Sequence, residues 1–148
     1  MCEAACLGNP VLRILDIPFA ASLPEAVLTR APAVLAACAA VMGAAGVGLA
    51  ALAAHQNGGE FGRTAALFLI LHAGALMGVS AHARIAPSPA LLVAGFVTAA
   101  GAALFSADLA RIAFAGERLF PLAAPLGGST MILGWLALAL VFLASARR

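Results

Sequence analysis

Four long uncharged runs, separated by short polar segments, dominate the pattern of this chain. They cover residues 33–54, 64–83, 89–107 and 126–146. Each run is close to the roughly 20 residues that an α-helix needs to cross the hydrocarbon core of a bilayer. Strands of a membrane barrel need only about ten residues of alternating polarity, so the runs favour helices. The pattern therefore predicts an all-α, integral membrane protein that forms a four-helix transmembrane bundle.

The polar segments predict the connections of an up-and-down bundle. Residues 55–63 form a glycine-rich turn, residues 84–87 form a tight turn that ends in proline, and residues 108–124 form the longest link. Pro32 suits the first turn of a helix, and Ser88 followed by Pro89 is a typical start. In the longest link, Asp108 and Arg111 are three residues apart, so we expect them to pair near the membrane surface.

The chain divides into two parts of different composition. Residues 31–148 contain all four predicted spans and form one membrane domain. Residues 1–30 contain three of the six acidic residues together with several prolines, and no basic start precedes an apolar core. They are therefore predicted to be a poorly ordered N-terminal tail, or an extension from a start codon assigned too far upstream, rather than a signal peptide.

Overall composition narrows the class of protein further. Hydrophobic residues make up 64% of the chain, charged residues 9%, and the mean hydropathy is +1.09. A soluble domain of this size needs far more polar residues to cover its surface. The net charge of +2 is too small for a nucleic-acid-binding footprint. The lipid bilayer is thus the expected partner, and nucleic acid is not.

The distribution of arginine predicts the orientation, because basic residues concentrate on the cytoplasmic side of membrane proteins. With four spans, both termini and the middle turn share one side. That side carries five arginines and the other carries three, Arg63, Arg111 and Arg118. We expect a multi-pass protein of the bacterial inner membrane with both termini in the cytoplasm.

Polar side chains inside the spans are the candidate functional residues, because lipid makes them costly. His72 lies near the middle of the second span. It is expected to form a hydrogen bond to Ser106, Thr98 or a backbone carbonyl, or else to serve a proton relay or a ligand. His55 and His82 end different spans on opposite faces, a separation that disfavours a shared metal site. No metal or other cofactor is predicted.

The sequence contains few other features that indicate a catalytic or binding activity. The spans contain no carboxylate, and no nucleophile motif or phosphate loop is present, so we expect no catalytic residues and no enzymatic activity. Glycine and alanine recur at small-x-x-x-small spacing, as in Gly74-x-x-x-Gly78, which predicts tight helix packing within the bundle or between subunits. Trp135, inside the fourth span, is expected to be a packing residue.

Several short motifs together resemble one family of small membrane proteins. They are Gly43-Ala-Ala-Gly-Val-Gly-Leu-Ala-Ala-Leu-Ala-Ala-His55, Leu71-His72-Ala73, Leu104-Phe105-Ser106, Ala124-Pro125-Leu126-Gly127-Gly128 and Ile132-Leu133-Gly134-Trp135. In this order the motifs resemble the domain of unknown function 423 family, whose animal members are called transmembrane protein 256. The chain departs from the family in having no tyrosine. The resemblance implies a four-span bacterial inner-membrane protein and supplies no activity.

Two functions follow as hypotheses. The first is a structural or accessory membrane protein that packs with itself or with a larger membrane protein. The alternative is a small transporter or channel subunit with a polar path near His72 and Ser106. The candidate residues are His55, His72, Ser106 and Asp108, and the turn that leads into the last helix is formed by Pro125, Gly127 and Gly128.

Overall fold

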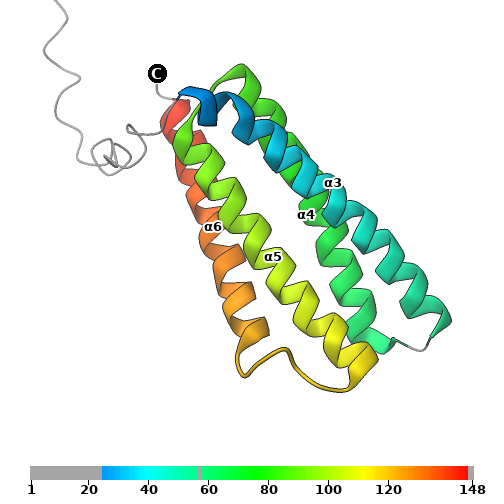
Figure 1. Ribbon diagram of the computed structural model, residues 1–148. Helices are drawn as coiled ribbons and strands as arrows, with labels where there is room; N and C mark the ends of the chain where they lie inside the picture. Colours follow the sequence, from blue (N-terminus) through cyan, green and yellow to red (C-terminus); the bar gives the residue numbers. More distant parts are fainter. Residues whose placement is uncertain (1–24, 57, 147–148) are drawn as a thin grey trace, which may run out of the picture.

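The four predicted spans are four long α-helices. The structure, a computed structural model, describes residues 25–56 and 58–146. The helices are α3 (Glu25–His55), α4 (Gly59–Ile85), α5 (Pro89–Ala115) and α6 (Ala123–Ser145), and no strand occurs among the described residues. All four are long and apolar enough to cross a membrane. Figure 1 shows them side by side with connections at alternate ends. The predicted all-α four-helix bundle is confirmed.

Local signals at the α4–α5 and α5–α6 connections explain where α5 begins and ends. Ser88 is extended, its hydroxyl oxygen accepts a hydrogen bond from the Leu91 N–H, and Pro89 follows in the first turn. This is the predicted start of the third span. At the other end, Gly116 adopts the left-handed conformation with φ 74°, and its N–H bonds to the Ile112 carbonyl. Glycine adopts this conformation without strain, which ends the helix.

The helices extend beyond the uncharged runs. The first begins at Glu25, so it includes part of the predicted tail, and Pro32 lies inside it rather than in its first turn. The rest of that tail, residues 1–24, lies outside the described residues. Helix α5 continues to Ala115, eight residues past the predicted span. A helix does not stop where the hydrocarbon stops, because its hydrogen bonds also form among interfacial polar residues.

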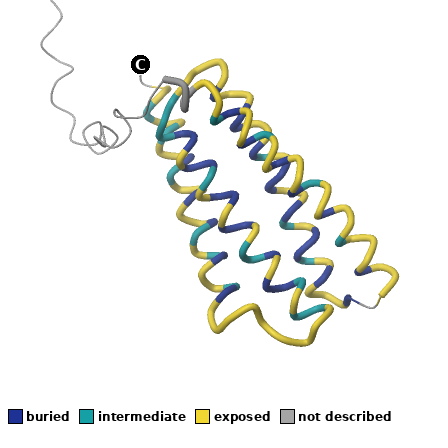
Figure 2. Tube along the Cα trace, in the orientation of Figure 1, coloured by how far each residue is buried: buried dark blue, intermediate teal, exposed yellow. Residues whose placement is uncertain are grey.

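The helices are not equivalent in their burial. In their most apolar stretches, 50% of the residues of α5 are buried, but only 22% of those of α3 and α6. The reason is the order of packing: α4 lies between α3 and α5, and α6 packs mainly on α5. Figure 2 shows the buried positions along the inner sides and exposed positions along the outer sides. The outer helices therefore present wide apolar faces to lipid.

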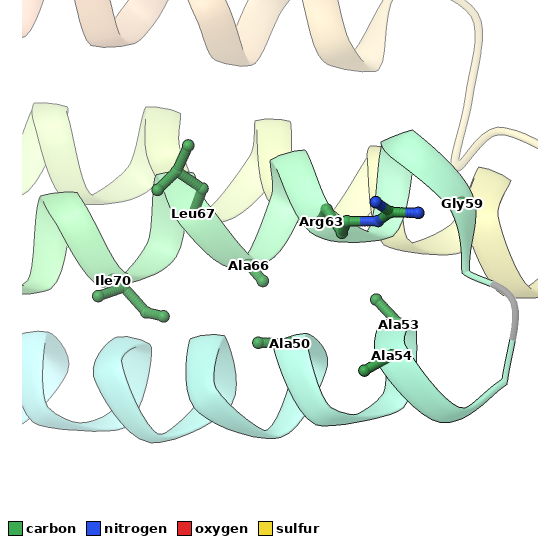
Figure 3. Close-up of a pocket in the computed structure, with 8 residues that line it drawn as sticks. All are labelled: Ala50, Ala53, Ala54, Gly59, Arg63, Ala66, Leu67 and Ile70. Carbon is green, nitrogen blue, oxygen red and sulfur yellow. The ribbon is translucent and has the colours of Figure 1, made fainter.

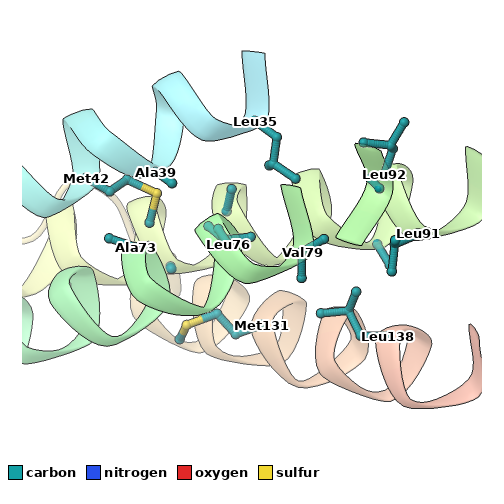
Figure 4. Packing of buried hydrophobic residues seen from close by; sticks show 14 of the residues in the cluster. Leu35, Ala39, Met42, Ala73, Leu76, Val79, Leu91, Leu92, Met131 and Leu138 are labelled. Atoms are coloured by element: carbon teal, nitrogen blue, oxygen red, sulfur yellow. The ribbon is translucent and has the colours of Figure 1, made fainter. Parts of the chain in front are cut away.

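A common core joins all four helices. Its larger members are leucines, with a valine and two methionines: Leu35, Met42, Leu69, Leu76, Val79, Leu91, Leu92, Met131 and Leu138. Figure 4 shows Leu76 of α4 and Met131 of α6 among the side chains that lie between the ribbons. One buried polar contact crosses the bundle beside them, where the Ser80 hydroxyl donates to the Pro32 carbonyl over 2.7 Å. This contact ties α4 to the first half of α3.

Glycines set the distance between α5 and α6. A Cβ built on Gly101 would lie 2.6 Å from the Met131 backbone nitrogen, and one built on Gly127 would lie 2.5 Å from that of Phe105. A Cβ on Gly134 would collide with the side chain and backbone of Thr98. No side chain fits at these three levels, so the backbones of α5 and α6 are in close contact over residues 98–105 and 127–134.

Candidate functional site

His72 lies at the centre of the bundle with both ring nitrogens occupied. Its side chain is 7% exposed. Nδ1 lies 2.8 Å from the Phe68 carbonyl oxygen, and Trp135 Nε1 donates to Nε2 over 3.2 Å. Because an indole N–H can only donate, Nε2 must be the unprotonated nitrogen, and Nδ1–H donates to Phe68. The site therefore holds the neutral imidazole in one tautomer.

Aromatic rings from three helices enclose this imidazole. The Phe68 ring stacks on it at a centroid distance of 5.8 Å, and the Trp135 ring meets it edge-on at 6.0 Å. Phe105 of α5 packs in turn against Phe68 at 4.8 Å. The cluster joins α4, α5 and α6 at one level, and Trp135, which is 45% exposed, lies between His72 and the lipid.

The partner of His72 on another helix is not one that the sequence predicted. Ser106, Thr98 or a backbone carbonyl was the expected partner, and Trp135 was expected to be a packing residue. A carbonyl does bind Nδ1, but from the same helix, and the contact between helices comes from Trp135. The hydroxyl of Thr98 donates instead to the Ala94 carbonyl of its own helix. One signal was present: a single tryptophan in mid-span has an N–H that requires an acceptor in lipid.

Ser106 is buried without a hydrogen bond. The residue is 1% exposed, and its hydroxyl oxygen has no hydrogen-bond partner among the described residues. Serines and threonines in helices commonly donate to the carbonyl four residues earlier, as Thr98 and Thr130 do. An unpaired hydroxyl in an apolar interior costs about 1–3 kcal/mol. It is the one buried side-chain nitrogen or oxygen without a hydrogen-bond partner in the described part of the bundle.

Asp108 fastens the α5–α6 connection to α5. The carboxylate is fully buried; it accepts a hydrogen bond from the Leu119 N–H over 2.8 Å and pairs with Arg118 at 3.3 Å. The predicted pair of Asp108 with Arg111 does not form, because Arg111 is exposed and pairs with Glu117. The connection folds back along the end of α5, which brings residues ten and eleven positions later within reach of Asp108.

The remaining predicted residues lie apart from His72. His55 is exposed at the end of α3, and His82 contacts the Phe142 ring near the other end of the bundle. Among the described residues, no group of three or more His, Cys, Asp or Glu side chains is arranged to hold a metal ion.

The geometry of the turn before the last helix fits a structural role. Leu122 has a φ of 70° immediately before α6, and Pro125 lies in the first turn. Gly127 is the point of backbone contact with Phe105, whereas a Cβ on Gly128 would meet only the Phe105 ring at 3.9 Å. Of the two adjacent glycines, only Gly127 is required by the packing.

Other glycines face outward. A Cβ on Gly74 or Gly78 would meet nothing within 4 Å, and both residues are exposed on the side of α4 that carries Leu71 and Met77. The same holds for Gly48 on α3. The spacing Gly74-x-x-x-Gly78 thus plays no part in packing within the described bundle.

The fold and the mid-span polar cluster define a multi-pass α-helical membrane protein. The chain matches the family described as "Protein of unknown function (DUF423)" over residues 42–128, more than half of its length. It belongs to this family, as its motifs indicated. The matched region contains His55, His72, Ser106, Asp108 and the Pro125–Gly128 turn, and it ends before Trp135. No solved structure matches the chain.

Proposed function

We propose that this protein is a non-enzymatic accessory protein of the bacterial inner membrane, and that it packs against another transmembrane helix through the outer face of α4. The observation that carries this proposal is the pair Gly74 and Gly78, which have open space where a Cβ would point. Small residues four apart let helix backbones approach closely in lipid. Inside this bundle, Gly101, Gly127 and Gly134 allow such a close approach between α5 and α6. The helix that packs there comes either from a second copy of this chain or from a larger membrane protein.

The polar side chains support the non-enzymatic part of the proposal. The hydroxyls of Ser80, Thr98 and Thr130 donate to backbone carbonyls rather than to a histidine. Both nitrogens of His72 are engaged with Phe68 and Trp135. No hydroxyl in this set is therefore activated by a neighbouring base, as nucleophilic catalysis requires.

The orientation with both termini in the cytoplasm is part of the same proposal. The end of the bundle that holds the α4–α5 turn carries Arg30 and Arg84, and Arg147 and Arg148 follow α6 in the sequence. The opposite end carries three arginines, Arg63, Arg111 and Arg118. The count of basic residues, four against three, therefore favours the end with the termini as the cytoplasmic one.

The association is tested by native mass spectrometry of the protein released in mild detergent. We expect a stoichiometric companion, either a second copy or a partner, that is lost in Gly78→Leu because the new side chain fills the contact face. Gly48→Leu is the matched control, since it changes an equally open glycine on α3. Two results together contradict the proposal. The protein is a monomer in detergent, and in vesicles it shows no energy transfer either between labelled copies or to co-purified protein.

One observation favours the second candidate, a transporter or channel subunit. The unpaired hydroxyl of Ser106 is the kind of group that a water or a passing solute satisfies. If Ser106 lines a polar path, Ser106→Ala lowers proton flux into vesicles under an imposed potential and leaves the amount of folded protein unchanged. If Ser106 is only a buried hydroxyl, flux does not change and the melting temperature rises slightly, since an unpaired polar group has been removed.

A further inference from the structure

A surface groove of about 700 Å³ runs between the last turns of α3 and the first turns of α4. Its α3 wall consists of alanines, and its α4 wall includes one charged residue and larger apolar ones. The side chains that matter here are Ala50, Ala53, Ala54, Arg63, Leu67 and Ile70. Figure 3 shows the alanines of α3 opposite Ala66 and Ile70, with Arg63 towards the connection between the two helices. A groove of this size can hold a small ligand or part of an elongated one.

Arg63 is the charged residue of this groove, and its guanidinium has no partner in the described part of the chain. Glu60 lies one turn earlier, yet no ion pair joins the two. The other two arginines at this end are both paired, Arg111 with Glu117 and Arg118 with Asp108. A second hollow, near the α5–α6 connection, also contains an arginine, but that residue is the paired Arg118. Of these two hollows in the described part of the chain, only the α3–α4 groove offers a free cation.

The groove extends from the level of the headgroups towards the hydrocarbon. Arg63 lies four residues after Gly59, the first residue of α4, which places it about 6 Å along the helix axis from its start. Ile70 lies seven residues further, about 10 Å deeper at 1.5 Å per residue. The charged end of the groove thus lies near the membrane surface, and its apolar part extends from there towards the interior of the bilayer.

We propose that this groove binds an anionic phospholipid, with the headgroup phosphate on Arg63 and one acyl chain along the alanines of α3. A planar guanidinium forms paired hydrogen bonds to phosphate, and it favours a lipid with net negative charge over a zwitterionic one. The alanines leave the width that larger side chains would fill. The groove ends at Ile70, one turn before Gly74 on the same face of α4. Only the lipid depends on the charge of Arg63, so a failure of the Arg63→Gln test leaves the proposed helix partner unaffected.

The test compares two lipids on the full chain in mild detergent. Phosphatidylglycerol and phosphatidylcholine with identical acyl chains are titrated, and bound lipid is counted by native mass spectrometry. We expect phosphatidylglycerol to bind about tenfold more tightly, and Arg63→Gln to remove that preference, as expected for one charge-assisted contact. Arg84→Gln is the matched control, because Arg84 is also exposed on α4 and free of an ion pair among the described residues, but lies at its other end. It should leave the preference intact.

A second variant tests the shape of the groove independently of the charge of Arg63. Ala50→Phe fills the groove with an apolar ring and alters no charge. We expect it to lose binding of phosphatidylglycerol, whereas Arg63→Gln loses only the preference over phosphatidylcholine. The melting temperature of Ala50→Phe without lipid shows whether it folds. Inorganic phosphate should not compete, because it has no acyl chain. Equal binding of both lipids, retained preference in Arg63→Gln, retained binding in a folded Ala50→Phe, or competition by inorganic phosphate would each overturn the proposal.

Discussion

The two outer helices attach to the inner pair in different ways. Between α5 and α6, Gly101, Gly127 and Gly134 each bring backbone against backbone, and no Cβ fits at any of them. Between α3 and α4, Gly46 approaches Ile70 and the Ala66 carbonyl, a Cβ on Gly58 or Gly62 would lie 2.9 or 3.1 Å from Ala53, and one on Gly43 would make an ordinary contact of 3.5 Å. The first interface is closed over residues 98–105 of α5 and 127–134 of α6, whereas the second has a groove near the membrane surface.

This difference arises although the two interfaces share a composition rich in glycine and alanine. In lipid, apolar burial alone gains little, so close packing depends on whether small residues of both helices fall at the same level. On α5 and α6 they do. On α3 and α4, the glycines at 48, 74 and 78 point away from the contact. Small residues that do not seal the bundle remain available to lipid or to another helix.

The largest expected effect is on the closed interface. Gly127→Ala places a Cβ 2.5 Å from the Phe105 backbone nitrogen, and backbone cannot move aside as a side chain can. We expect a loss of about 3 kcal/mol or more, at the upper end of overpacking effects, measured as a fall in the unfolding midpoint in detergent. Gly74→Ala is the control, because its Cβ meets open space and the change should be neutral or stabilising. Similar losses in both variants would contradict the comparison.

An intermediate effect is expected at the end of the same interface. Asp108→Ala removes the acceptor of the Leu119 N–H and the partner of Arg118, which leaves polar groups unpaired beside a buried position. The expected cost is about 1–3 kcal/mol, measured by the same unfolding assay. Proteolysis of the α5–α6 connection should also become faster, since the segment is no longer fastened to α5.

Glu117→Gln is the appropriate control for Asp108. It weakens the pair with Arg111, in which both side chains are largely exposed, and exposed pairs contribute at most about 1 kcal/mol. If Glu117→Gln and Asp108→Ala had equal effects, the connection would not depend on the buried carboxylate.

The smallest effect concerns the link between α6 and α4. His72→Phe keeps an aromatic ring beside Phe68 and removes the acceptor of the Trp135 N–H. Hydrogen bonds between helices in lipid average about 0.6 kcal/mol, so we expect a small loss of stability and a coupling of that size in a cycle with Trp135→Phe. Because the chain has one tryptophan, its fluorescence reports on Trp135 alone. An emission spectrum that is identical in His72→Phe would argue against the hydrogen bond.

Most of the fold could be predicted from the sequence, and much less of the site. Uncharged runs of sufficient length specify membrane helices, because every backbone hydrogen bond must be made within the segment. The start of α5 was predicted because Ser88 and Pro89 act locally. The starts of α3 and α4 were not, since polar residues at the membrane surface continue a helix without an apolar pattern. Asp108 was assigned to Arg111 because only local spacing was available, whereas its partners come from a folded-back connection.

The sequence by itself determined that this protein lies in a lipid bilayer, that it is helical and that its helices run up and down, because these properties depend on local hydropathy and turn chemistry. Only the tertiary structure decided which polar groups meet. The rotation and level of neighbouring helices brought Trp135 to His72, left Ser106 without a partner, turned Gly78 outward and left Arg63 free above a groove. Those outcomes depend on how whole helices pack, and no spacing along a single chain records them.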